Sequence, residues 1–141
     1  MTAPERTYSP ESVLEIRDLA VSFNTGRGRV RAVDQVDFVL ERGQVLGIAG
    51  ESGCGKSVTA LSVMRLLPRP VSRIDQGQIL FNGQDLAGLS PEQMHRVRGR
   101  KIAMIFQEPM TALNPVHRVA RQIMEVYQLH FPGQDKQAMH D

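Results

Sequence analysis

Hydrophobic and polar residues alternate along two early segments of the chain. Residues 13–23 and 30–40 mix β-branched with polar side chains at a rough two-residue period, which places Val36, Phe38 and Leu40 on one side. The short connection between the segments contains two glycines. This period is typical of half-buried strands, and a glycine-rich link suits a chain reversal. We therefore expect an antiparallel strand pair.

A short apolar run followed by a helical period comes next. Residues 44–49 are mostly apolar, as in a strand buried in a sheet that is covered on both faces. From residue 56 to 67 the apolar positions recur at helical spacing, and Pro68 ends the run. The glycine-rich residues 50–55 join this expected strand to the expected helix. The order is strand, glycine loop, helix.

Four further elements follow. Residues 77–81 predict a strand that enters a hairpin at Asn-Gly 82–83, because this pair readily supplies two positive-φ residues. Ser90, followed by a proline and then a glutamine three residues on, forms a capping box and predicts a short helix. Residues 101–106 are a second candidate for a buried strand, and residues 116–127 carry an amphipathic helical stripe.

Composition agrees with one soluble domain. The chain has 141 residues, of which 41% are hydrophobic and 23% charged. Its single cysteine, Cys54, cannot form an internal disulfide, which indicates a reducing, cytoplasmic setting. The N-terminus lacks an apolar signal region, and no apolar stretch is long enough to cross a bilayer. Any connection to a membrane is expected to run through a partner.

Charge gives little support to a nucleic-acid partner. The formal net charge is only +2, from seventeen basic and fifteen acidic side chains. A cluster of four basic residues is the one candidate patch: Arg96, Arg98, Arg100 and Lys101. No aromatic residue is interleaved for base stacking, so a solvated face is the favoured interpretation. We predict no nucleic-acid partner.

The loop after residue 49 matches the phosphate-binding pattern G-x-x-x-x-G-K-[ST]. Its glycines let successive N–H groups point at phosphate oxygens, and the following helix aims its positive end at the same anion. Lys56 is expected to reach the β- and γ-phosphates of ATP, and the Ser57 hydroxyl to ligate Mg²⁺. A chance match in this length has odds on the order of one in a few hundred. The predicted nucleotide-binding residues are Gly50, Ser52, Gly53, Cys54, Gly55, Lys56, Ser57 and Val58.

Cys54 occupies a free position of this loop. The simplest interpretation is a small residue that fits there. A thiol in this position is also exposed to alkylating reagents, so we expect bound ATP to protect Cys54 from N-ethylmaleimide.

Two segments resemble one known family. Residues 50–61 (GESGCGKSVTAL) and 104–115 (MIFQEPMTALNP) are similar to the ATP-binding subunits of ABC transporters, and more narrowly to those of oligopeptide, dipeptide, glutathione and nickel importers. The resemblance runs from about Val13 to the end. It implies an α/β P-loop NTPase fold of the ABC type, in its N-terminal portion: an antiparallel β subdomain, the core strand–loop–helix unit and the start of a helical subdomain.

The resemblance also implies roles for two residues outside the loop. Gln107 falls on the family's Q-loop glutamine, which contacts Mg²⁺ or the attacking water and links the site to the membrane subunits. Phe23 lies where the family places an aromatic residue that stacks on adenine; a core phenylalanine at a strand end explains it equally well. Val58 replaces a second hydroxyl residue, so only its N–H is expected to bind phosphate.

The domain organisation expected from the resemblance is a flexible leader, residues 1–12, and a truncated ATP-binding domain, residues 13–141. Residues 13–115 would hold the β subdomain, phosphate loop and Q-loop, and residues 116–141 the start of the helical subdomain. The family's signature motif, Walker B glutamate and switch histidine do not occur. We therefore expect the family's ATP hydrolysis to be negligible in this chain alone.

The resemblance implies ATP and Mg²⁺ as cofactors and three kinds of partner. These are membrane-spanning permease subunits, a second ATP-binding subunit and, indirectly, a periplasmic or extracellular solute-binding protein. The expected location is the cytoplasmic face of the inner membrane. A non-hydrolytic nucleotide-binding or partner-docking module remains the alternative function.

Two surfaces are expected to matter for association. Core packing is expected to account for most of the stripe on residues 116–129, while Met110 and Leu113 are candidates for contact with a membrane subunit. The strand at residues 44–49 is expected to lack neighbours and to expose an edge.

Overall fold

The computed structural model describes residues 11–107 and 113–130. The chain divides into two compact units, Met1–Leu89 and Ser90–Asp141, and each is described by itself. The first unit contains β1 (Ser12–Thr25), β2 (Gly28–Glu41), α1 (Lys56–Val63), β3 (Ser72–Phe81) and β4 (Gln84–Asp85). The second contains α2 (Pro91–Val97) and α3 (Val119–His130).

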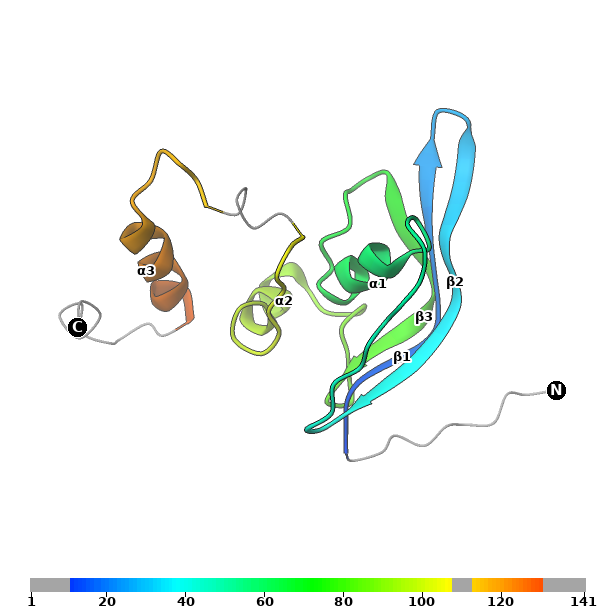
Figure 1. Ribbon diagram of the computed structural model, residues 1–141, viewed down its shortest axis with the longest axis horizontal. Helices are drawn as coiled ribbons and strands as arrows, with labels where there is room; N and C mark the ends of the chain where they lie inside the picture. The colour runs from blue at the N-terminus through cyan, green and yellow to red at the C-terminus, as the bar shows by residue number, and fades with distance from the viewer. Residues whose placement is uncertain (1–10, 108–112, 131–141) are drawn as a thin grey trace. The chain divides into compact units, whose positions relative to one another are not determined.

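The first unit is built on an antiparallel sheet with the strand order β2-β1-β3-β4 (Figure 1). The expected pair β1–β2 is confirmed, with Phe23 opposite Val30 near the hairpin end. The expected hairpin after β3 is confirmed as well, because Asn82 and Gly83 both have positive φ, 46° and 78°. Strand β1 therefore lies inside the sheet, between its hairpin partner β2 and the later strand β3.

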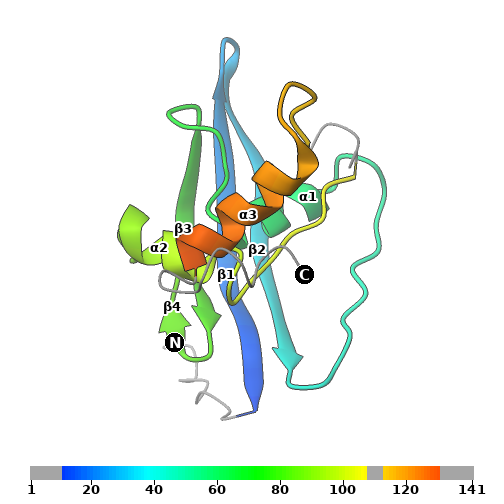
Figure 2. The same cartoon turned by 90° about the vertical axis from the view of Figure 1, so that its left-hand side faces the viewer.

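The hydrophobic core of this unit follows the central strand. Ile16, Leu19 and Val21 of β1 are at most 1% exposed, and Ile79 of β3 is fully buried beside them. On β2 the predicted alternation holds, since Val36, Phe38 and Leu40 are half-buried and the residues between them are exposed. Helix α1 lies along one face of the sheet, where Val63 is buried (Figures 1 and 2).

Polar contacts tie three strands together at the hairpin end of the sheet. Arg29 of β2 donates from Nε to the Ser22 hydroxyl on β1 at 2.7 Å. The same guanidinium forms an ion pair with Asp75 of β3. The Asp75 side chain is only 11% exposed, so its charge is matched from within the sheet.

Both predicted buried strands are wrong for the described structure. Residues 44–49 form no strand, and Val45 is 98% exposed; Figure 2 shows the connection from β2 to α1 as an open loop. Residues 101–106 likewise form no strand, with Ile105 92% exposed. A strand exists only through hydrogen bonds to a neighbouring strand. No described strand pairs with residues 44–49, and residues 101–106 make only an isolated bridge between Ile102 and Arg98.

The helices agree with the sequence in type and differ in detail. Helix α1 ends at Val63, four residues before the expected end, because Arg65 turns to a positive φ of 50°. Helix α2 has the predicted capping box at Ser90. Helix α3 overlaps most of the predicted stripe and ends at His130, but none of its residues is buried, so the expected core packing of the stripe is wrong for the described structure. Leu113 is exposed; Met110 and residues 1–10 of the predicted leader lie outside the described residues.

Candidate functional site

The loop between residues 50 and 57 is held by a close backbone approach at Gly55. Gly55 is the N-cap of α1 and has a φ of 94°. A Cβ atom there would lie 2.6 Å from the carbonyl oxygen of Ala32 on β2. No side chain fits this gap, and the positive φ disfavours any L residue. The second glycine of the motif is therefore required by the sheet behind the loop.

The first turn of α1 leaves its N–H groups without a side-chain cap. Gly55 offers no side-chain acceptor, so the amides of the first turn face the loop. Thr59 strengthens this start: its N–H and its hydroxyl both donate to the Gly55 carbonyl, at 2.8 and 3.0 Å. Uncapped amides and the positive end of the helix together favour an anion at this point.

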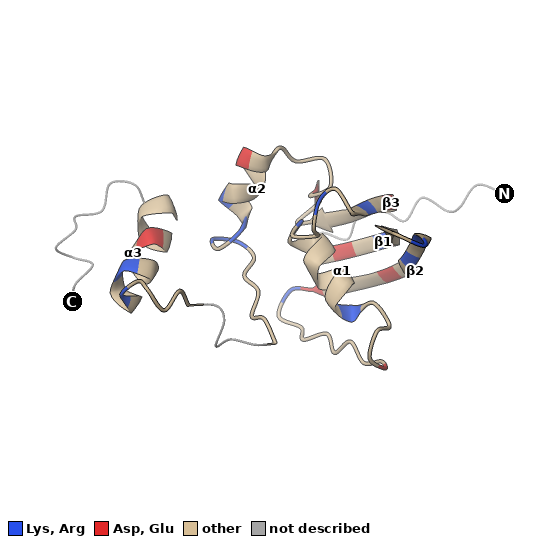
Figure 3. Ribbon diagram, turned by 90° about the horizontal axis from the view of Figure 1, so that it is seen from above, with Lys and Arg blue, Asp and Glu red and all other residues tan. Residues whose placement is uncertain are grey.

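The Lys56 ammonium lies over the loop. Its Nζ donates to the carbonyl oxygens of Gly50 at 2.6 Å and Glu51 at 2.7 Å, and lies 3.3 Å from the Cys54 sulfur. In Figure 3 a basic position is visible at the beginning of α1. An ammonium has three donors and no acceptor, so the two carbonyls hold a cation at the mouth of the glycine loop. The Lys56 ammonium and the uncapped amides of the first turn of α1 together form an electropositive site, which we call the cradle.

A group of phosphate oxygens fits this cradle. The amides of the first turn and the Lys56 ammonium supply donors, and the glycines leave room for close approach. Ser57 is exposed one residue further along α1, where its hydroxyl is available to a hard cation such as Mg²⁺. Among the described residues no group of three or more His, Cys, Asp or Glu side chains is placed to hold a metal. A cation here would depend on Ser57 and on phosphate oxygens.

The other predicted site residues lie elsewhere. Phe23 is half-buried on β1, in the same unit as the loop, opposite Val30 and Ser72. Gln107 is exposed in the second unit, so its relation to the loop stays a prediction. The structure thus brings together Gly50, Cys54 and Lys56 directly.

Two residues that shape the cradle were missed by the sequence analysis. The Ala32 carbonyl, which makes Gly55 obligatory, comes from a strand 23 positions earlier and leaves no local signal. Thr59 does leave a local signal, because a threonine four residues after the N-cap can donate from its hydroxyl to the carbonyl of the N-cap residue.

A family model described as "ABC transporter" matches residues 33–141, which include the whole loop and α1. The chain belongs to the ABC transporter family. Its fold class is accordingly the α/β P-loop NTPase class predicted above, and the assignment implies nucleotide binding. Among the described residues, no helix of this ABC transporter chain is long and apolar enough to cross a membrane.

Relatives of this ABC transporter chain are named for peptide transport. It is 52% identical over 118 residues to the probable peptide ABC transporter ATP-binding protein y4tR of Sinorhizobium fredii, covering 84% of this chain and 35% of that protein. It is 52% identical over 114 residues to the oligopeptide transport ATP-binding protein OppD of Bacillus subtilis, covering 81% and 32%. For the dipeptide transport ATP-binding protein DppD of the same organism the identity is 49% over 120 residues, covering 85% and 36%. The chain spans about a third of the length of these curated relatives.

Proposed function

We propose that this chain supplies the phosphate-binding part of an ATP-binding subunit in an ABC importer for peptides or related small solutes. The observation that carries the proposal is the position of the Lys56 ammonium, held by the Gly50 and Glu51 carbonyls over the uncapped start of α1. The names of the relatives support the peptide cargo.

Each predicted site residue has a distinct task in this proposal. Lys56 would exchange its two carbonyl partners for β- and γ-phosphate oxygens, which carry full negative charge and bind an ammonium more strongly. The loop amides from Ser52 to Val58 would donate to the same oxygens. Ser57 and Gln107 would ligate Mg²⁺, which neutralises phosphate charge during phosphoryl transfer. Phe23 would stack on adenine.

ATP hydrolysis in the assembled transporter would need more than these residues. Gln107 is proposed to orient water and to couple the site to the membrane subunits through its loop. A second ATP-binding subunit, the permease subunits and, indirectly, a solute-binding protein are the proposed partners, at the cytoplasmic face of the inner membrane. A non-hydrolytic binding module is the alternative, and it shares the loop chemistry.

The single cysteine gives a direct test of nucleotide binding. Cys54 is exposed and its sulfur lies 3.3 Å from the Lys56 ammonium. We expect Mg-ATP to slow alkylation of the 141-residue chain by N-ethylmaleimide about tenfold or more at saturation, because a bound phosphate group covers the loop. Mass spectrometry over time measures the rate at this one thiol.

The controls separate nucleotide binding from other effects. Lys56→Ala should abolish protection, whereas Lys101→Ala, which alters an exposed lysine of the second unit, should retain it. Equal labelling rates with and without Mg-ATP in the unaltered chain would contradict the proposal. Robust ATP turnover by the chain alone, lost in Lys56→Ala, would contradict the expected need for further motifs.

A further inference from the structure

The buried face of α1 carries two hydroxyl groups. Thr59 is 6% exposed and Ser62 is fully buried, and Val63 is the third buried residue of this helix. The Thr59 hydroxyl donates to the Gly55 carbonyl oxygen at 3.0 Å. The Ser62 hydroxyl donates to the Val58 carbonyl oxygen at 2.7 Å. Because such a bond slightly destabilises a helix, these hydroxyls point to a role other than packing.

The two hydroxyls act on different peptide groups. In a trans peptide the C=O and the N–H point in opposite directions, so a bond that fixes the carbonyl also fixes the amide. The Gly55 carbonyl shares its peptide group with the N–H of Lys56, the first residue of α1, which has no acceptor within the helix. The Val58 carbonyl shares its peptide group with the Thr59 N–H, which already donates to Gly55 at 2.8 Å. Of the two hydroxyls, the one on Thr59 therefore acts on an amide that is open to a ligand.

The peptide group between Gly55 and Lys56 has little freedom to rotate. The N–H and the hydroxyl of Thr59 both bind its carbonyl oxygen. Strand β2 closes the space beside Gly55, since a Cβ atom there would lie 2.6 Å from the Ala32 carbonyl oxygen and 3.2 Å from Cγ2 of Val33. The Lys56 N–H is therefore held in the direction of the N-terminal end of α1, where the phosphate loop lies.

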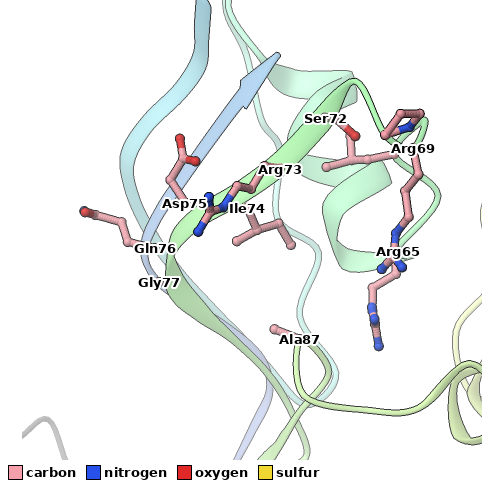
Figure 4. Close-up of a pocket in the computed structure, with 11 residues that line it drawn as sticks. Arg65, Arg69, Ser72, Arg73, Ile74, Asp75, Gln76, Gly77 and Ala87 are labelled. Carbon is pink, nitrogen blue, oxygen red and sulfur yellow. The ribbon is translucent and has the colours of Figure 1, made fainter. Parts of the chain in front are cut away.

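The other end of α1 is anchored separately. Arg65 donates from Nη1 to the carbonyl oxygens of Leu86 and Leu89. It also lines a cavity together with residues of β3 (Figure 4), and none of the described residues that line this cavity belongs to the phosphate loop. Loss of the Thr59 hydroxyl should therefore leave the helix in place and increase only the freedom of its first peptide group.

We propose that Thr59 is a positioning residue of the nucleotide site, whose hydroxyl holds the Lys56 N–H ready to bind a phosphate oxygen of Mg-ATP. This inference rests on the proposed function, because it concerns the same site. Its physical basis is preorganisation: a donor that is already in place loses less freedom when the anion binds, and so binds it more tightly.

The concentration of Mg-ATP that gives half-maximal protection of Cys54 from N-ethylmaleimide measures the nucleotide affinity of each variant. Thr59→Val keeps the shape of the side chain and removes the hydroxyl, and it should weaken Mg-ATP binding about three- to tenfold, the effect of one hydrogen bond. Thr59→Ser keeps the hydroxyl and should bind within about twofold of the unaltered chain. Ser62→Ala is the matched control, since it removes the other buried hydroxyl of α1, and it should also stay within about twofold.

The possible outcomes separate positioning from packing. Urea unfolding checks that each variant is folded, and Thr59→Ala removes the same hydroxyl should Thr59→Val fail to fold. Equal weakening by Thr59→Val and Ser62→Ala, or weakening by Thr59→Ser as well, would reduce the effect to helix packing and overturn the inference. Unchanged affinity in Thr59→Val would overturn it while leaving the proposed nucleotide site intact. Absence of protection in the unaltered chain would contradict the proposed function itself, and this inference with it.

Discussion

Gly55 combines two constraints that act on one residue. Its φ of 94° disfavours side chains, and the Ala32 carbonyl blocks the space that a Cβ would take. The neighbouring Gly53 has a similar φ of 82° but open space around it. A side chain at Gly53 would meet backbone strain alone, whereas a side chain at Gly55 would meet both backbone strain and a steric clash.

Substitution of these glycines should have unequal effects. Gly53→Ala should cost about 1 kcal/mol of stability through backbone strain alone, whereas Gly55→Ala should cost more, about 2–4 kcal/mol, because the loop must also leave β2. Denaturant unfolding of the two variants measures the difference. Mg-ATP protection of Cys54 should be lost in Gly55→Ala, and equal stability of the two variants would contradict the role of Ala32.

The capping box at Ser90 is the clearest case of an element specified by its own residues. The Ser90 hydroxyl accepts from the Gln93 N–H at 3.2 Å, and the Gln93 side chain accepts from the Ser90 N–H at 2.8 Å. The same hydroxyl donates to the Glu92 carboxylate at 2.8 Å. That hydrogen bond is the main reason why the pKa of Glu92 lies below its usual value.

Ser90→Ala should raise the pKa of Glu92 toward its ordinary value and destabilise α2 by about 1 kcal/mol through loss of the cap. Because the folded-state pKa of Glu92 is lowered, its contribution is present at neutral pH and is lost as the pH falls through that lowered pKa. NMR titration of the Glu92 carboxyl group measures the shift. Gln93→Ala is the control, since it leaves the Ser90 hydroxyl free to donate to Glu92; a raised pKa there would contradict the assignment.

Elements that depend on distant partners were predicted less well. The strands at residues 44–49 and 101–106 have the right composition, but a buried strand needs neighbours on both edges and covering layers on both faces. The capping box of α2 and the hairpin at Asn82 need only adjacent residues, and both were predicted correctly. Helix α3 formed as predicted, because the helical period is set by residues close together in the sequence. The burial of its apolar face depends on distant elements, and this part of the prediction was wrong.

Across the chain, several large apolar side chains are exposed. Val45, Ile48 and Ile105 are all more than half exposed, and so are Val119 and Ile123 of α3. Exposed apolar surface of this kind favours association with other protein surfaces. We therefore expect the isolated chain to self-associate.

Sedimentation velocity over a range of concentrations checks this expectation. Val45→Lys/Ile48→Lys should shift the chain toward monomer, because the substitutions replace two exposed apolar side chains with charged ones. Val30→Lys/Val39→Lys, which adds the same two positive charges at exposed positions of β2, is the matched control and should shift it less. A monomeric chain with a cooperative thermal melt would contradict the prediction.

The sequence alone determined the features whose cause is local. The phosphate loop, the β1–β2 hairpin, the Asn82-Gly83 turn and the capping box are each specified by residues within a few positions of one another. Tertiary structure alone decided that Gly55 lies against Ala32 and that Asp75 is paired with Arg29. These contacts join residues from different strands and loops, and only the folded sheet sets the distances between them.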